Sequence, residues 1–242
     1  VLYIAATIAC IGLPSARPAV RPVGTSRSQE AREALGELRE GFAVVIRDRE
    51  ISRPIIHQAA SASVAGVLGV LGPGLARSVG INPDQLIVVV LPLGIGVVLG
   101  VLGMRRLSRL PRWRVAELGL LCFGGLTASL ALVAPLRNAL NDVSVVPLLA
   151  TIGLVAGAAY AVTLVSAQTA LLESMPADVR GRVFGVLASI TSTASLLPAL
   201  LAGPLADRIS APLVLVIVGL IVVSVALWSA LLFGPRRAKS GG

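Results

Sequence analysis

Six stretches of this chain are apolar over about the length that a helix needs to cross a lipid bilayer. They run roughly over residues 55–75, 84–104, 115–134, 144–166, 183–203 and 211–233. A spanning helix needs about 20 mostly apolar residues, because the hydrocarbon core is about 30 Å thick and a helix rises about 1.5 Å per residue. With 55% hydrophobic and only 14% charged residues, the chain has too little polar surface to coat a water-soluble globule of 242 residues. The sequence therefore predicts an all-α integral membrane protein.

Basic residues collect in alternate loops between these stretches. Segments 14–54, 105–114 and 173–182 and the C-terminal tail carry 8, 5, 2 and 3 Lys plus Arg, whereas the other loops carry only Arg77, Arg137 and Arg208. Because cytoplasmic loops are enriched in Lys and Arg, we expect a multi-pass plasma-membrane protein with a cytoplasmic C-terminus. The net charge of +9 then requires no nucleic acid partner, and acidic residues interrupt the Arg-rich segment 14–53, which argues against one.

The segment before the first complete span has two parts. Residues 16–28 are rich in Pro, Arg and Ser, which predicts a flexible linker. From Gln29 to Ile51, apolar residues recur at steps of four and three, which predicts an amphipathic helix along the membrane surface. A role as a tether between two halves of a protein and a plain solvated linker helix are both compatible with this pattern.

Residues 173–185 read ESMPADVRGRVFG and place several charges in an otherwise apolar region. A short cytoplasmic hairpin accounts for the charges, because they meet water and lipid headgroups there at little cost. Their order resembles the corner between the tenth and eleventh helices of major facilitator superfamily transporters, in the branch of enterobactin-exporter-like and related efflux permeases. LREGF at 38–42 and AGPLADR at 202–208 resemble the segments before the seventh helix and at the end of the eleventh.

The resemblance implies the C-terminal six-helix bundle of a major facilitator superfamily fold plus the end of the preceding helix, from a bacterial protein. Residues 1–13 are then the end of a truncated sixth helix, 14–54 a cytoplasmic linker, 55–233 helices seven to twelve, and 234–242 a basic tail. The partner would be the N-terminal six-helix half of the same transporter. Three positions depart from the family's pattern: Ser108 stands where an Asp is common, and Pro111 and Ser210 stand where a Gly is common.

Uncharged polar residues within the spans are the candidates for a substrate cavity. They are Gln58, Ser61, Tyr160, Thr163, Ser192 and Ser195. No Asp, Glu, Lys or Arg lies near the middle of a span, and Glu117 lies within about a turn of the cytoplasmic face. A mostly apolar cavity with a few hydroxyls suits a small amphiphilic substrate, although Ser and Thr in helices also bond back to the preceding turn.

The charged corner is the candidate for a cytoplasmic gate, formed by Glu173, Asp178, Arg180 and Arg182. The resemblance implies alternating access, in which two bundles rock about a central cavity. In that mechanism an acidic residue of the first half packs near the start of the eleventh helix. The partial positive charge of that helix start and the arginines would favour the contact, so the corner would latch the cytoplasmic side.

Glycines within the spans are expected to allow close approach of helices, because lipid gives apolar helices no hydrophobic drive to associate. Three groups stand out: Gly66, Gly69, Gly72 and Gly74 in the first span, Gly94, Gly96, Gly100 and Gly103 in the second, and Gly153 with Gly157 in the fourth. We expect most of them to serve packing.

Enzyme and metal functions find little support in the sequence. The chain has one histidine, His57, which we expect at the membrane interface, and two distant cysteines, Cys10 and Cys122. No catalytic or metal-binding motif is present, so we expect no catalytic residue, cofactor or metal.

The alternative function is a permease subunit of an ATP-binding-cassette transporter, since Glu30, Ala31 and Gly36 match the spacing of its ATPase-docking helix. Asp48 and Arg49 stand where Leu and Pro normally follow.

Overall fold

A computed structural model describes residues 48–78, 87–107, 110–133, 142–175 and 180–232. The chain divides into two compact units, Val1–Glu37 and Leu38–Gly242, and all described residues belong to the second. The truncated helix expected at 1–13, most of the linker at 14–54, the residues of the ATPase-docking pattern at 30–36 and the basic tail at 234–242 lie outside the described residues, as does Asp178.

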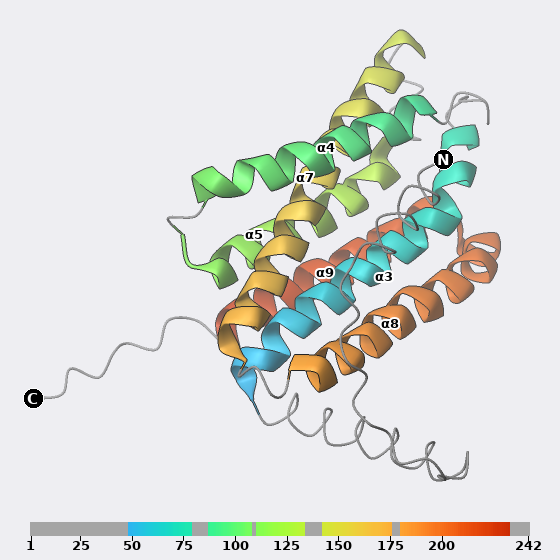
Figure 1. The fold of residues 1–242 in the computed structure, drawn as a ribbon. Coiled ribbons are helices and arrows are strands. Elements are labelled where there is room, and N and C mark those ends of the chain that lie inside the picture. Colours follow the sequence, from blue (N-terminus) through green and yellow to red (C-terminus); the bar gives the residue numbers. More distant parts are fainter. Residues whose placement is uncertain (1–47, 79–86, 108–109, 134–141, 176–179, 233–242) are drawn as a thin grey trace, which may run out of the picture. The chain divides into compact units, whose positions relative to one another are not determined.

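Six long helices make up the described part of the second unit (Figure 1). They are α3 (Arg49–Ser78), α4 (Ile87–Leu107), α5 (Arg112–Ser129), α7 (Asp142–Ser174), α8 (Arg180–Ile209) and α9 (Ala211–Leu232), and a short 3-10 helix, η2 (Leu130–Leu132), follows α5. All six are long and apolar enough to cross a membrane. The predicted all-α architecture with six spans is confirmed for these residues, and it is that of a multi-pass membrane protein.

Several helices extend beyond the apolar stretches read from the sequence. Helix α3 begins at Arg49 instead of near residue 55, and α7 continues to Ser174 instead of ending near residue 166. At the start of α3 the Asp48 carboxylate accepts a hydrogen bond of 2.9 Å from the backbone N–H of Glu50, which satisfies a helix donor that has no partner within the helix. Hydropathy marks only the hydrocarbon-length part of a helix, whereas polar turns continue past it.

The helices associate in pairs along their length. Helix α4 packs along α7, α3 along α8, and α5 lies between α7 and α9. Helix α3 also touches α5, α7 and α9, so it occupies the centre of the unit. Figure 1 shows α4 crossing α7 and α3 running beside α8.

Only some of the glycines permit this close packing. A Cβ atom added at Gly96 or Gly157 would collide with the backbone between α4 and α7, and one added at Gly66 would collide with the Ser195 carbonyl of α8. Gly100 is similar, because its Cβ would lie 2.6 Å from the Ala158 carbonyl oxygen. The expected packing role does not hold for five other glycines, at which a Cβ would meet nothing within 4 Å: Gly69, Gly72, Gly74, Gly94 and Gly103.

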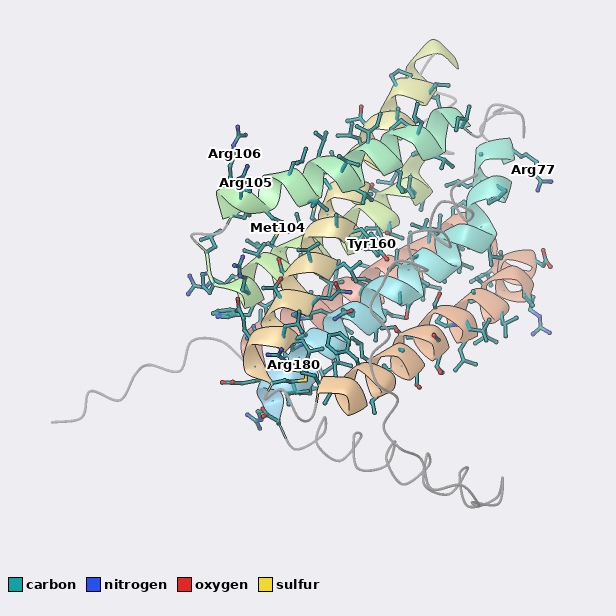
Figure 2. The ribbon with its side chains drawn as sticks, in the orientation of Figure 1. Arg77, Met104, Arg105, Arg106, Tyr160 and Arg180 are labelled. Carbon is teal, nitrogen blue, oxygen red and sulfur yellow. The ribbon has the colours of Figure 1, made fainter. Side chains whose placement is uncertain are left out.

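The starts of α3, α5 and α8 and the ends of α4, α7 and α9 share one end of the unit. An apolar cluster there joins Ile51 of α3, Leu171 of α7 and Val183 of α8. Figure 2 shows Arg105, Arg106 and Arg180 toward this end and Arg77 at the other. We call it the arginine-rich end. The helix ends that flank the basic loops of the sequence thus lie together at one end of the unit. The side of the membrane that this end faces stays a prediction.

Candidate functional site

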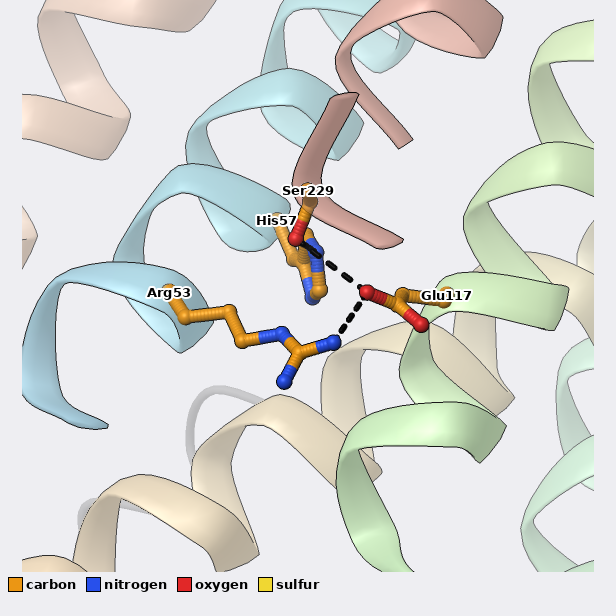
Figure 3. Close-up of polar contacts among 4 residues, drawn as sticks. All are labelled: Arg53, His57, Glu117 and Ser229. Carbon is orange, nitrogen blue, oxygen red and sulfur yellow. Dashed lines mark hydrogen bonds and ion pairs between the residues drawn. The ribbon is translucent and has the colours of Figure 1, made fainter. Parts of the chain in front are cut away.

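Four buried polar side chains from three helices lie in contact near the arginine-rich end. Figure 3 shows the four residues and the two contacts that Arg53 and Ser229 make with Glu117. Arg53 of α3 donates from Nη2 to Glu117 Oε1 of α5, and the Ser229 hydroxyl of α9 donates to the same oxygen over 3.2 Å. His57 Nε2 lies 3.0 Å from Ser229 Oγ. The Ser229 hydroxyl can donate to Glu117 and accept from His57 at the same time in the His57 tautomer that is protonated at Nε2. We call these residues the buried polar network.

The network is almost completely removed from solvent. Glu117 is 5% exposed, Arg53 9%, Ser229 3% and His57 1%. Charges buried this far are tolerated only when they are paired and hydrogen-bonded. The Arg53–Glu117 ion pair meets that requirement, and its guanidinium also lies over the Trp113 ring, 4.4 Å from the centroid.

Helical spacing explains how the sequence assembles the network. Arg53 and His57 are four residues apart on α3, and Trp113 and Glu117 are four apart on α5, so each pair shares one face of its helix. The two faces meet where α3 touches α5. Ser229 completes the network from the last turn of α9.

The order of contacts determines what the network can do chemically. In a hydrolase triad the histidine lies between the nucleophile and the acid, whereas here Ser229 lies between His57 and Glu117. In this order Glu117 does not orient His57, so His57 is not held as a base that would activate the Ser229 hydroxyl. Within the part of the chain that the structure describes, no group of three or more His, Cys, Asp or Glu side chains could hold a metal ion. The arrangement instead joins α3, α5 and α9 through side chains.

The six candidates for the substrate cavity lie in separate places. Ser61 and Thr163 are fully buried, and their hydroxyls donate to the His57 and Ala159 carbonyl oxygens of their own helices, each over 2.9 Å. This is the back-bonding alternative. Tyr160 of α7, labelled in Figure 2, is half-buried. Its ring centroid lies 5.4 Å from that of Phe123.

Two further groups complete the set of cavity candidates. Gln58 is buried, and its Nε2 has no hydrogen-bond partner among the described residues. Ser192 and Ser195 line a shallow surface groove on α8 together with Thr191, Leu196 and Ala199. The structure therefore brings only Ser192 and Ser195 together, with Ser192 exposed and Ser195 half-buried beside Gly66 of α3.

The gate candidates lie at the junction of α7 and α8. Glu173 is exposed and forms an ion pair with Arg112 of α5, with 3.8 Å between Oε1 and Nε. The Arg180 guanidinium donates to the carbonyl oxygens of Leu172 and Met175, each over 3.4 Å. These carbonyls belong to the last turn of α7 and the residue after it, where carbonyl groups lack partners within the helix. Asp178 and the side chain of Arg182 lie outside the described part.

Sequence reasoning missed the buried polar network. His57 and Glu117 lie within the first three turns of α3 and α5, close to the helix starts as expected, but their burial among helices and their contacts were not predicted. The physical reason is that each finds its partners on other helices, so the cost of removing it from water is offset within the protein. The usable signal was the presence of Arg53, His57 and Glu117 within a few turns of span ends that share one side.

Comparisons with known proteins supply no relative for this chain. No protein family, curated protein or solved structure matches it.

Proposed function

We propose that this chain is part of a secondary active transporter of the major facilitator type, an efflux permease for small amphiphilic molecules. Its six helices would be the seventh to twelfth of the complete protein. The observation that carries the proposal is the groove around Ser192 and Ser195 near the middle of α8. The Thr191 hydroxyl beside them already donates to the Leu187 carbonyl oxygen over 2.8 Å. Polar groups at the depth of the hydrocarbon core normally face protein or a water-filled path, and a substrate path between two bundles provides one.

The character of the groove supports an amphiphilic substrate. Its hydroxyl groups lie beside Leu196, which is 59% exposed, and Ala199. A ligand that contacts this surface gains from burying apolar area and from one or two hydrogen bonds. Charged side chains do not line the groove, which disfavours a strongly charged substrate at this face.

The buried polar network supports the mechanical part of the proposal. Alternating access requires each bundle to move largely as a rigid body about the substrate site. Arg53, Glu117 and Ser229 join α3, α5 and α9 at the arginine-rich end, and Arg180 joins the start of α8 to the end of α7. These contacts would let the helices move together.

Thiol accessibility tests the proposed substrate path in the complete transporter. In a background with Cys10 and Cys122 replaced by Ser, we expect Ser192→Cys to react with a water-soluble thiol reagent and substrate to slow that reaction. Leu102→Cys is the matched control, since Leu102 of α4 is 62% exposed on an apolar helix and should face lipid. Equal reactivity of the two cysteines would overturn the proposal.

Transport by the complete protein in reconstituted vesicles tests the class of transporter. We expect uptake or release driven by an ion gradient without a separate ATPase. Dependence on ATP and a co-purifying ATPase subunit would favour the ATP-binding-cassette alternative and contradict the proposal.

The proposed gate has a test of its own. Replacing Arg182 with Ala should weaken the cytoplasmic latch and favour inward-open states. We expect cysteines placed on the cytoplasmic side of the substrate path to become more reactive in that variant. Unchanged reactivity would reject the latch while leaving the transporter assignment standing.

A further inference from the structure

A partly open cavity of about 270 Å³ lies between α3, α4, α5 and α7, and its lining residues Gly69 and Val90 are exposed. We infer that this cavity is a binding site for a hydrocarbon group, either the acyl chain of a lipid or a free apolar molecule. The inference goes beyond the proposed transport function, because the cavity lies among helices of one bundle and has no residue of α8 in its lining. The lining residues are Leu68, Gly69, Gly72, Pro73, Leu75, Ala76, Val90, Leu93, Thr127, Leu130, Leu149, Ile152, Gly153 and Ala156.

The lining offers almost nothing to a polar ligand. Thr127 is the one lining residue with a polar side chain, and its hydroxyl already donates to the Phe123 carbonyl oxygen over 2.8 Å. A water molecule needs two to four polar partners to be held in a cavity, and a polar ligand group buried here would lose its hydrogen bonds to water without replacement. The chemistry of the wall therefore selects hydrocarbon.

The space results from glycines that no helix contact requires. A Cβ added at Gly69 or Gly72 would meet nothing within 4 Å, whereas one added at Gly66, in the same helix, would collide with α8. Glycine within a helix costs about 0.5–1 kcal/mol relative to alanine. At Gly66 close packing of α3 on α8 offsets that cost. At Gly69 and Gly72 no such packing exists among the described residues, and a ligand in the cavity supplies the missing contacts.

The size of the cavity sets the size of the ligand. A dry apolar cavity of roughly 150 Å³, lined by Leu, Ile and Phe, is known to bind benzene or xenon. The larger volume here, about 270 Å³, accommodates a hydrocarbon group bigger than benzene. Apolar cavities that stay empty also lose dispersion contacts along their walls, so occupation stabilises the surrounding helices.

Photolabelling of the purified chain in lipid vesicles tests the site and distinguishes its two sources of ligand. One arm uses 3-trifluoromethyl-3-phenyldiazirine, a free apolar probe, and the other uses phosphatidylcholine with a diazirine in its acyl chain. Labelled residues are identified by mass spectrometry of peptides. We expect Leu75 and Ile152 to be labelled in at least one arm, and excess toluene to reduce that labelling at least fivefold in the arm with the free probe. Lipid-facing Leu102, 62% exposed, is the internal reference, and its labelling should not change.

Variants that fill the cavity provide the second measurement. Gly72→Leu should abolish labelling of Ile152, since its side chain would occupy the space. Gly103→Leu is the matched control, because a Cβ there also meets nothing within 4 Å but Gly103 does not line the cavity. Three results would overturn the inference. The first is no labelling of Leu75 and Ile152 in either arm, and the second is labelling that toluene leaves unchanged in the wild-type arm with the free probe. The third is labelling that persists in a folded Gly72→Leu protein. The wild-type arms decide the question even if that variant fails to fold.

Discussion

The two ends of this helical unit are held together in different ways. At the arginine-rich end, an ion pair and hydrogen bonds join Arg53, Glu117, Ser229 and His57, and an apolar cluster around Leu171 fills the space beside them. In the opposite half, α3, α4, α5 and α7 surround an apolar cavity with glycines in its wall.

The difference shows how helices of similar composition acquire different interiors in a membrane. Lipid chains are as apolar as leucine side chains, so hydrophobicity alone does not draw spanning helices together. Specific contacts must do so, and buried charges are especially effective because they have no good alternative partner in lipid. Buried charges hold the helices at the arginine-rich end. In the opposite half, apolar clusters and close contacts such as that of Gly157 with Leu93 pack the helices, and this packing leaves room for another molecule.

Removing the acidic partner of the buried ion pair should produce the largest effect. Glu117→Ala removes the carboxylate that Arg53 and Ser229 both contact, and breaking a buried ion pair in this way typically destabilises by about 3–5 kcal/mol. We expect this fall in the free energy of unfolding, measured by titration with sodium dodecyl sulfate in mixed micelles. The double variant Arg53→Met with Glu117→Leu should recover most of the loss. A single variant within about 1 kcal/mol of wild type would show that the pair does not hold the arginine-rich end.

Adding one methyl group at a close contact should have the next largest effect. The Cβ of Gly157→Ala would meet the backbone of α4 at Leu93, which forces the two helices apart. Overpacking of this kind typically costs about 1–3 kcal/mol. Gly72→Ala, where a Cβ meets nothing within 4 Å, is the matched control and should unfold no more easily than wild type. Similar losses in both variants would contradict the distinction between packing and cavity glycines.

Loss of the central hydroxyl of the network should have a smaller effect. Ser229→Ala removes the hydrogen bond to Glu117 and leaves His57 Nε2 without its partner, at a cost of about 1 kcal/mol. Ser224→Ala, at an exposed position of the same helix, is the control in the same titration and should be neutral. If Ser229→Ala unfolds as wild type does, the hydroxyl contributes nothing to the joining of α9.

The smallest effect is expected at the tight connection between α8 and α9. Ser210 has a φ angle of 110°, a region that only glycine adopts without strain. Ser210→Gly should raise the thermal unfolding temperature by an amount corresponding to roughly 0.5–1 kcal/mol, since relief of strain exceeds the added chain entropy. Ser210→Ala keeps the strain and should show no gain. A Gly variant that melts no higher than the Ala variant would rule out strain at this residue.

The helices could be predicted from the sequence because span length depends on one property, hydropathy over about 20 residues. All six spans were found, although α3 and α7 extend further than predicted. Other features depend on neighbours that are far apart in the chain. Arg53 and Glu117 are separated by 64 positions, and Ser229 and Glu117 by 112. The sequence places Arg53 and Glu117 near span ends on one side, but only knowledge of which helices touch shows that they pair.

The glycines and hydroxyls show the same limit. Gly66 and Gly69 are three residues apart and have similar neighbours in the sequence. In the structure, however, Gly66 contacts α8, whereas Gly69 faces open space. Likewise Ser61 and Ser192 are both serines within spans, but the first bonds to its own helix while the second lies in a surface groove. In each case residue type is identical, and only the position of the next helix decides the role.

The side of the membrane on which each helix end lies tests the account most directly. Single cysteines at Arg77 and Leu110, both exposed and at opposite ends of the unit, can be placed in a protein whose Cys10 and Cys122 are replaced by Ser. With a membrane-impermeant maleimide added to intact cells, we expect Arg77→Cys to react and Leu110→Cys to react only after permeabilisation. Reaction of both from the outside, or the reverse order, would contradict the proposed threading of these helices through the membrane.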